Sequence, residues 1–211
     1  ALLGLAPRRE WQRVADNMAA PTLLDDGTYA ALSTPPHLIR KDHPSMLMAL
    51  GWLPPTEMIS PDVMRSTLDA VWARWDLQSS WGWDYPVMAM TAARLGDLRR
   101  AFDALLLPSP KNEFLANGHN PQIPGFLSLY LPANGGLLAA IAHIVAAIEA
   151  GTPVPEGWRV AYEGGAPSAT LTDRTASAVG GPPQPRHERI DIQGQPVDNF
   201  DSECHRKPAP P

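Results

Sequence analysis

The chain has 211 residues and a formal net charge of −5, and 44% of its residues are hydrophobic. This length suits one domain or a part of a larger one, and the mildly acidic charge argues against nucleic acid or an anionic membrane as a partner. The single cysteine, Cys204, excludes an internal disulfide and a metal cluster built on several cysteines. The longest apolar run, residues 137–148, is interrupted by His143 and is too short to cross a bilayer.

Hydrophobic periodicity predicts no convincing strand and a series of helices, over residues 8–20, 43–50, 61–75, 86–95, 97–107 and 135–150. The strongest start signal is Ser60-Pro61, an N-cap followed by proline at the first helical position. Asp42, Asp97 and Asn134 are the other predicted N-caps. We therefore expect an all-α fold.

Two kinds of helix alternate along this series. The helices at 8–20, 61–75 and 97–107 are amphipathic, and Trp11 is expected to pack on the apolar face of the first. The helices at 43–50, 86–95 and 137–150 are apolar nearly all round, which is typical of helices buried on all sides. This alternation indicates an outer and an inner layer of helices.

The longer connections, residues 21–42, 76–85 and 108–134, all precede the apolar helices, so we expect them to lie at one end of the fold. Binding residues commonly lie on such loops. Their short polar side chains can bind neighbouring hydroxyl groups, and their indole faces can stack on a sugar ring, which predicts a carbohydrate site. The candidate binding residues are Trp81, Trp83, His43, Asn117, His119, Asn120, Gln122, Tyr130 and Asn134. Since the histidines lack metal-ligand spacing, we expect no metal and no other cofactor.

Three runs in this region carry a family resemblance: WGWDYPVMAMTAARLG at 81–96, NGHN at 117–120 and LYLPANGGLL at 129–138. With them, residues 1 to about 163 resemble the C-terminal part of a bacterial six-hairpin glycosidase, related to glycoside hydrolase families 65 and 95. The resemblance implies an (α/α)6 barrel, of which three hairpins are present here. The chain would then form about half of the barrel, and its principal partner would be the missing N-terminal half.

The resemblance also implies an activity. We expect a carbohydrate-active enzyme, a glycoside hydrolase or phosphorylase of the inverting type, with an oligosaccharide or glycoside as substrate and with the isolated segment inactive. Family 95 proteins have a catalytic Asp just before the Gly-Gly of the last inner helix, whereas residues 130–133 hold no carboxylate. Asp84 is therefore the first catalytic candidate and Asp42 the second, and the general acid is expected upstream. A carboxyl at a helix N-terminus suits a base, and the helix start at Asn134 could hold phosphate in a phosphorylase.

A different class stays open beside the enzyme: a non-catalytic, helical sugar-binding or scaffold protein. Asp84 and Asp42 are also open to a simpler interpretation as helix N-caps, which does not exclude a role in sugar binding. No nucleic-acid or membrane partner is expected in either case. The location in the cell stays open, with a periplasmic or secreted one slightly favoured.

The two ends of the chain bear on its domain organisation. It opens at Ala1 within an apolar stretch, without an initiator Met or a signal-peptide front, which indicates a segment of a longer protein. Residues 166–211 contain only six Leu, Ile, Val or Phe residues, which is typical of disorder. We expect a folded part over 1–165 and a low-complexity tail over 166–211, either a disordered extension or the product of a shifted reading frame.

Overall fold

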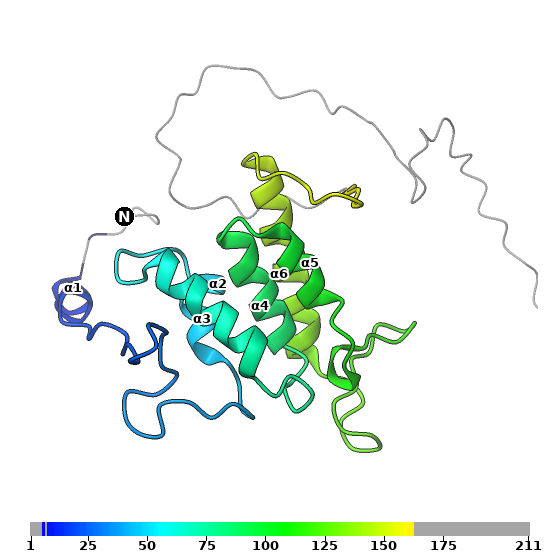
Figure 1. Ribbon diagram of the computed structural model, residues 1–211, viewed down its shortest axis with the longest axis horizontal. Helices are drawn as coiled ribbons and strands as arrows, with labels where there is room; N and C mark the ends of the chain where they lie inside the picture. The colour runs from blue at the N-terminus through cyan, green and yellow to red at the C-terminus, as the bar shows by residue number, and fades with distance from the viewer. Residues whose placement is uncertain (1–5, 7, 163–211) are drawn as a thin grey trace, which may run out of the picture.

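The computed structural model describes residue 6 and residues 8–162, so the tail predicted for 166–211 lies outside the described residues. Within them the chain forms six α-helices, two short 3-10 helices and no strand, and the prediction of an all-α fold is confirmed for this part of the chain. The elements are α1 (Arg9–Asp16), η1 (Ser45–Leu47), α2 (Met48–Gly51), α3 (Pro61–Arg74), α4 (Asp84–Arg94), α5 (Leu98–Leu105), η2 (Pro110–Asn112) and α6 (Leu131–Glu149) (Figure 1).

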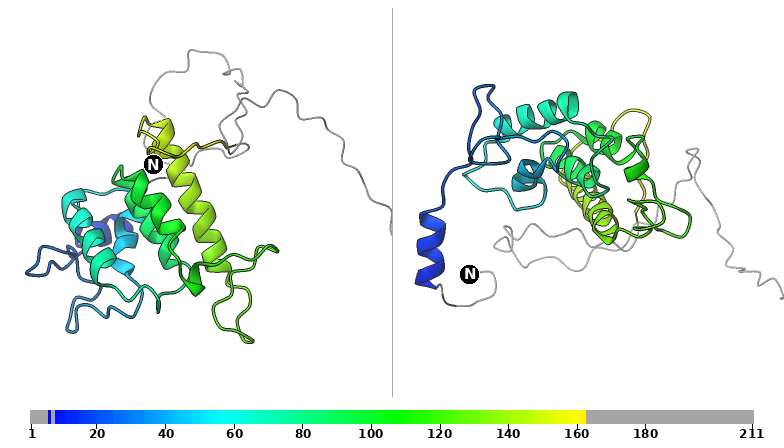
Figure 2. Two further views of the ribbon diagram at one scale, coloured as in Figure 1. Left: turned by 45° about the vertical axis from the view of Figure 1, so that its right-hand side comes forward. Right: turned by 90° about the horizontal axis from the view of Figure 1, so that it is seen from below.

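Helix α4 is the centre of the fold. All its residues from Asp84 to Ala93 are buried, as the apolar pattern of 86–95 predicts. It packs mainly against α2, α5 and α6, and the views of Figures 1 and 2 show it between them. Gly51 allows α2 to come close, because a β-carbon there would lie 3.0 Å from both the Thr91 nitrogen and the Val87 oxygen. The backbone contact between α2 and α4 therefore depends on a residue without a side chain.

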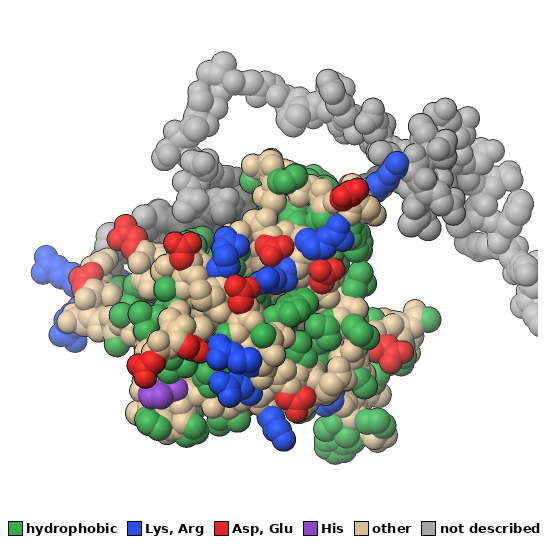
Figure 3. Space-filling model, viewed as in Figure 1, with side chains coloured by type: hydrophobic (Ala, Val, Ile, Leu, Met, Phe, Trp, Pro, Cys, Tyr) green, Lys and Arg blue, Asp and Glu red, His purple; other side chains and the backbone are tan. Residues whose placement is uncertain are grey.

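Helices α3 and α5 begin where their capping residues predict. The Ser60 hydroxyl accepts from the amide of Val63 at 3.4 Å, and the Asp97 carboxylate accepts from the amide of Arg100 at 3.0 Å. Both helices bury one apolar stripe and leave charged side chains outside, which Figure 3 shows as mixed blue and red atoms. One of these exposed pairs joins Arg100 of α5 to Asp69 of α3.

Two predicted helix starts are wrong. After Asp42 the chain forms a 3-10 turn that begins beyond Pro44, and the Asp42 carboxylate accepts only from the adjacent amide of His43, at 2.8 Å. Helix α6 begins at Leu131 rather than at Asn134, because Pro132 fits the first turn of a helix and lacks the amide that would need a partner. The Asn134 side chain instead donates to the carbonyl of Gly118 at 2.8 Å. Asn134 therefore does not open the helix, and the phosphate site expected there loses its basis.

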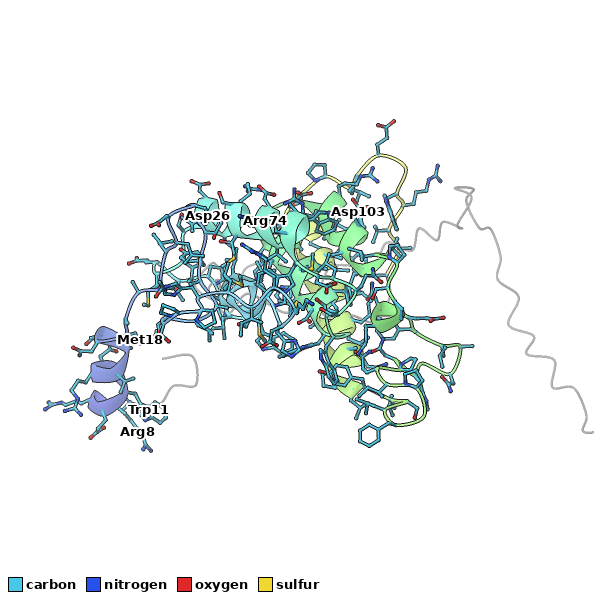
Figure 4. The ribbon with its side chains drawn as sticks, turned by 60° about the horizontal axis from the view of Figure 1, so that its bottom comes forward. Arg8, Trp11, Met18, Asp26, Arg74 and Asp103 are labelled. Carbon is cyan, nitrogen blue, oxygen red and sulfur yellow. The ribbon has the colours of Figure 1, made fainter. Side chains whose placement is uncertain are left out.

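The expectation that helix 137–150 is buried all round is also wrong. Ala140 and Ile144 are buried in the core, but Leu138 is 70% and Ile141 is 44% exposed, because the described residues cover only one side of α6. The first helix differs from expectation as well. Helix α1 buries no residue, and Trp11, expected in packing, is 69% exposed beside Arg8 (Figure 4).

By length and composition, α6 is the one helix of the described part that could cross a membrane. Its mean hydropathy is 1.7 over an 18-residue window, and 28% of that window is buried. The same test is passed by core helices of water-soluble proteins. The absence of a membrane partner therefore stays a prediction.

Candidate functional site

The loops before η1, α4 and α6 meet at one end of the helices, the lower end in Figure 1, which confirms their predicted placement. The first turns of α4 and α6 are neighbours, since a β-carbon on Gly136 would lie 3.1 Å from the β-carbon of Pro86. The loop before η1 is joined to the same end by the Trp75 indole, which donates to the Asp42 carbonyl at 2.6 Å. This arrangement brings segments from three parts of the sequence to one place.

Asp84 lies in the first turn of α4 and is only 2% exposed. Its Oδ2 accepts from the backbone amide of Trp81 at 2.8 Å, and its two oxygens lie 3.0 and 3.1 Å from Nδ1 of His43. Burial raises the pKa of the Asp84 carboxyl, while the neighbouring His43 side chain and the Trp81 amide oppose the rise. The carboxylate thus points into the protein, at two partners that it already binds.

The His43 ring lies between this carboxylate and the two tryptophans. Its Nδ1 is 2.8 Å from the indole nitrogen of Trp83, and the two rings meet edge to face with centroids 4.9 Å apart. Trp81 is tilted against the same imidazole at 6.4 Å. The side chain of His43 is 31% exposed, which makes it far more accessible than Asp84.

Trp81 is the centre of an aromatic surface built from three loops. Tyr130, the residue before α6, lies 5.3 Å from it between ring centroids. Burial raises the pKa of the Tyr130 hydroxyl, and the negative charge of Asp84 raises it further. The ammonium group of Lys111 lies 4.7 Å from the centre of the Trp81 ring. Sequence reasoning missed Lys111, because a single lysine in a long loop has no pattern that points to a neighbouring indole.

Asn120 and Gln122 belong to the architecture of the loop before α6. Both side chains are buried and bind protein groups. The Asn120 amide donates to the carbonyls of Lys111 and Glu113 at 3.1 and 2.8 Å, and Gln122 donates to Asn120 Oδ1 at 2.6 Å. The oxygen of Gln122 accepts from the amide of Gly82 at 2.8 Å. These two predicted binding residues therefore support the loops that carry the aromatic surface and do not offer free groups to a ligand.

The other predicted residues lie around this centre. Asn117 is exposed and accepts from the amide of His119 at 3.0 Å, and Asn134 binds the carbonyl between them, that of Gly118. Asp42 is exposed, with one oxygen 3.9 Å from Nε2 of His43. The structure thus brings together a central group, which we call the aromatic site: His43, Trp81, Trp83, Asp84, Lys111 and Tyr130.

In the described part of the chain, no group of three or more His, Cys, Asp or Glu side chains is placed to hold a metal ion. The chain matches no protein-family model, no curated protein and no solved structure. The resemblance to six-hairpin glycosidases therefore stays an interpretation of the sequence.

Proposed function

We propose that this chain is part of a carbohydrate-active enzyme, a glycoside hydrolase or phosphorylase, and that the aromatic site binds a sugar ring. The observation that carries the proposal is the grouping of Trp81, Trp83 and Tyr130 around the paired side chains of His43 and Asp84. Indole and phenol rings offer an apolar face to the C–H groups of a sugar and a polar edge to its hydroxyls. Such a mixture of aromatic and hydrogen-bonding groups is typical of small-ligand sites.

The fold that we propose for the whole enzyme is the (α/α)6 barrel, with the described helices forming about half of it. Two features support the proposal. Apolar and amphipathic helices alternate along the chain, and the loops before the apolar helices meet at the end that carries the aromatic site. The exposed side of α6, with Leu138 and Ile141, would face the remaining helices.

Hydrolysis of a glycoside by inversion needs two carboxyl groups about 6.5–9.5 Å apart, one acid and one base. Near the aromatic site the described residues offer Asp84, which is enclosed, and Asp42, which is exposed beside His43. We assign the acid to a residue outside the described part. The aromatic site would then bind the sugar and supply the general base of the reaction.

The experiment is a calorimetric titration of the full chain with a panel of neutral and acidic oligosaccharides. Trp81→Ala removes the centre of the aromatic surface. Trp52→Ala is the matched control, because Trp52 directly follows α2, is 46% exposed and is not part of the aromatic site. We expect Trp81→Ala to weaken binding at least about tenfold, equal to about 1.4 kcal/mol, and Trp52→Ala to leave it unchanged. Absence of binding to every sugar, or equal binding by both variants, would contradict the proposal.

A second candidate function is sugar binding without catalysis. The specific observation in its favour is that the Asp84 carboxylate is 2% exposed and already hydrogen-bonded, so it does not face a glycosidic bond. A protein that binds a sugar in the titration but releases no reducing sugar and transfers none to phosphate would support this candidate.

A further inference from the structure

We propose that Nε2 of His43, with the ring held by Asp84, is the group of the aromatic site that accepts a proton from a hydroxyl of the bound sugar or from a water beside it. The inference rests on the proposed function, since it assigns the proton transfer of that same site. It moves this role from the carboxylate, where the sequence places it, to the imidazole. Asp84 then acts as a positioning residue.

Asp84 is too enclosed to exchange a proton with a ligand. The carboxylate is 2% exposed, and its oxygens are occupied by the Trp81 amide and by Nδ1 of His43. A group that exchanges a proton with a ligand must come within about 2.6–3.2 Å of it, directly or through one water. His43 meets this condition better, because its side chain is 31% exposed.

Nδ1 of His43 has two neighbours that compete for it. The indole N–H of Trp83, at 2.8 Å, can only donate, whereas an ionised Asp84, at 3.0 and 3.1 Å, can only accept. Nδ1 can either accept from the indole N–H or donate to the carboxylate, but it cannot do both. Hydrogen bonds to an ionised group are about twice as strong as neutral ones, so an ionised Asp84 places the hydrogen on Nδ1. Nε2 is then left with its lone pair.

The surroundings of Nε2 favour its protonation during the transfer. One oxygen of the exposed Asp42 carboxylate lies 3.9 Å from Nε2, and Asp84 lies at the other ring nitrogen, Nδ1. Lys111 and Tyr130 contact Trp81. When Nε2 takes a proton from a hydroxyl or a water, the imidazolium lies between two carboxylates that stabilise it. The oxygen that loses the proton becomes an alkoxide or hydroxide nucleophile, so atoms and charge balance.

Asp84 and His43 resemble the carboxylate–histidine pairs in which the carboxylate fixes the histidine tautomer and stays ionised. In such a pair the amide variant of the carboxylate keeps the shape but reverses the tautomer, because an amide N–H points at Nδ1. Asp84→Asn is therefore the informative change. Asp62→Asn is its matched control, because Asp62 is an exposed residue of the first turn of α3.

The first test is nitrogen NMR of the full chain with labelled histidine near neutral pH, with His43→Gln used to assign the signal. We expect the wild type and Asp62→Asn to show a protonated Nδ1 and a free Nε2 on His43. We expect Asp84→Asn to shift the major form to Nε2–H. A wild-type His43 protonated mainly on Nε2 would overturn the inference, whether or not any sugar binds.

The second test compares binding and turnover in the complete enzyme that carries this chain, on a sugar that the wild type binds. His43→Gln should lower turnover by about 10²–10⁴-fold, the usual contribution of a general acid or base, and should affect turnover more than the Kd. The control His37→Gln changes a histidine of another loop, whose Nδ1 meets the carbonyl of Leu32. Full turnover by His43→Gln, or binding by the wild type without any turnover, would overturn the proton-transfer role, whereas absence of sugar binding would instead refute the proposed function.

Discussion

The backbone amide of Gly82 donates to the side-chain oxygen of Gln122 at 2.8 Å, across 40 positions of sequence. This bond fastens the loop before α4 to the loop before α6. The two tryptophans on either side of Gly82 and Tyr130 of the second loop therefore have a fixed relation to each other. The geometry of the aromatic site therefore depends on this junction between the two loops.

The first prediction concerns Gly82. A β-carbon there would lie 2.7 Å from the Lys111 carbonyl and 2.8 Å from the Gln122 amide nitrogen, so Gly82→Ala forces the loops apart. We expect a loss of about 1–3 kcal/mol in the free energy of unfolding, measured in urea, and a loss of sugar binding. Gly135→Ala is the control, because its β-carbon meets nothing within 4 Å and alanine suits a helix better than glycine. Equal stability of Gly82→Ala and wild type would show that the junction is not tight.

The second prediction concerns Asn120, which is fully buried and binds two carbonyls of its own loop. Asn120→Ala leaves the Glu113 carbonyl without its donor and removes the oxygen that accepts from the Gln122 amide, while the Lys111 carbonyl keeps its bond from Gln122. We expect a cost of about 1–3 kcal/mol. Thermal unfolding followed by circular dichroism measures the effect. Asn17→Ala, which removes an exposed bond to the Arg13 carbonyl, should change the midpoint little.

The third prediction is a pH dependence. Burial lowers the pKa of His143, and the positive charge of Arg94 lowers it further. Between this lowered value and 6.5, the ordinary value, the unfolded chain binds more protons than the folded chain. The stability contribution of neutral His143 is therefore present above pH 6.5 and is lost as the pH falls through the window below it.

Urea unfolding at about pH 8 and about pH 5 measures this dependence. The wild type should lose stability toward the lower pH, and His143→Gln should lose less. The variant His37→Gln should keep the wild-type difference. A pH dependence identical in His143→Gln and wild type would show that the buried histidine does not cause it.

The fourth prediction separates the two sides of α6. Ile144 is 3% exposed, so Ile144→Ala should cost about 2–4 kcal/mol in the free energy of unfolding. Leu138 is 70% exposed, so Leu138→Ala should stay within about 0.5 kcal/mol of wild type. A large loss in Leu138→Ala would show that another surface covers this side of the helix in solution.

The sequence predicted helix positions well where the signal is local. Ser60 and Asp97 cap the helices that follow them, because a capping side chain acts on amides only two or three residues away. Asn134 shows where local signals compete, since Pro132 offers an earlier start and the helix uses it. The burial of α6 was predicted wrongly because the apolar pattern of a helix does not say how many neighbours cover it.

The same division holds for the aromatic site. Its tryptophans and Asp84 were predicted, because two indoles around a glycine in a loop are unusual and because an Asp starts the next helix. The contact between His43 and Asp84 spans 41 positions, and it depends on how α2 and α4 pack. Its consequence, a carboxylate turned toward an imidazole rather than outward, needs the three-dimensional arrangement.

The buried side-chain amides of Asn120 and Gln122 make most of their hydrogen bonds within the loop before α6. One further bond, from Gly82 to Gln122, joins this loop to the loop before α4. Residues 123–127 form a separate turn, in which the backbone amides of Ile123 and Leu127 each donate to the carbonyl of the other. A protein built this way can exchange the tip of one loop for another length or composition without redesigning its helices. Laboratory evolution of ligand preference would therefore do best to randomise 123–127 while keeping Asn120 and Gln122 unchanged.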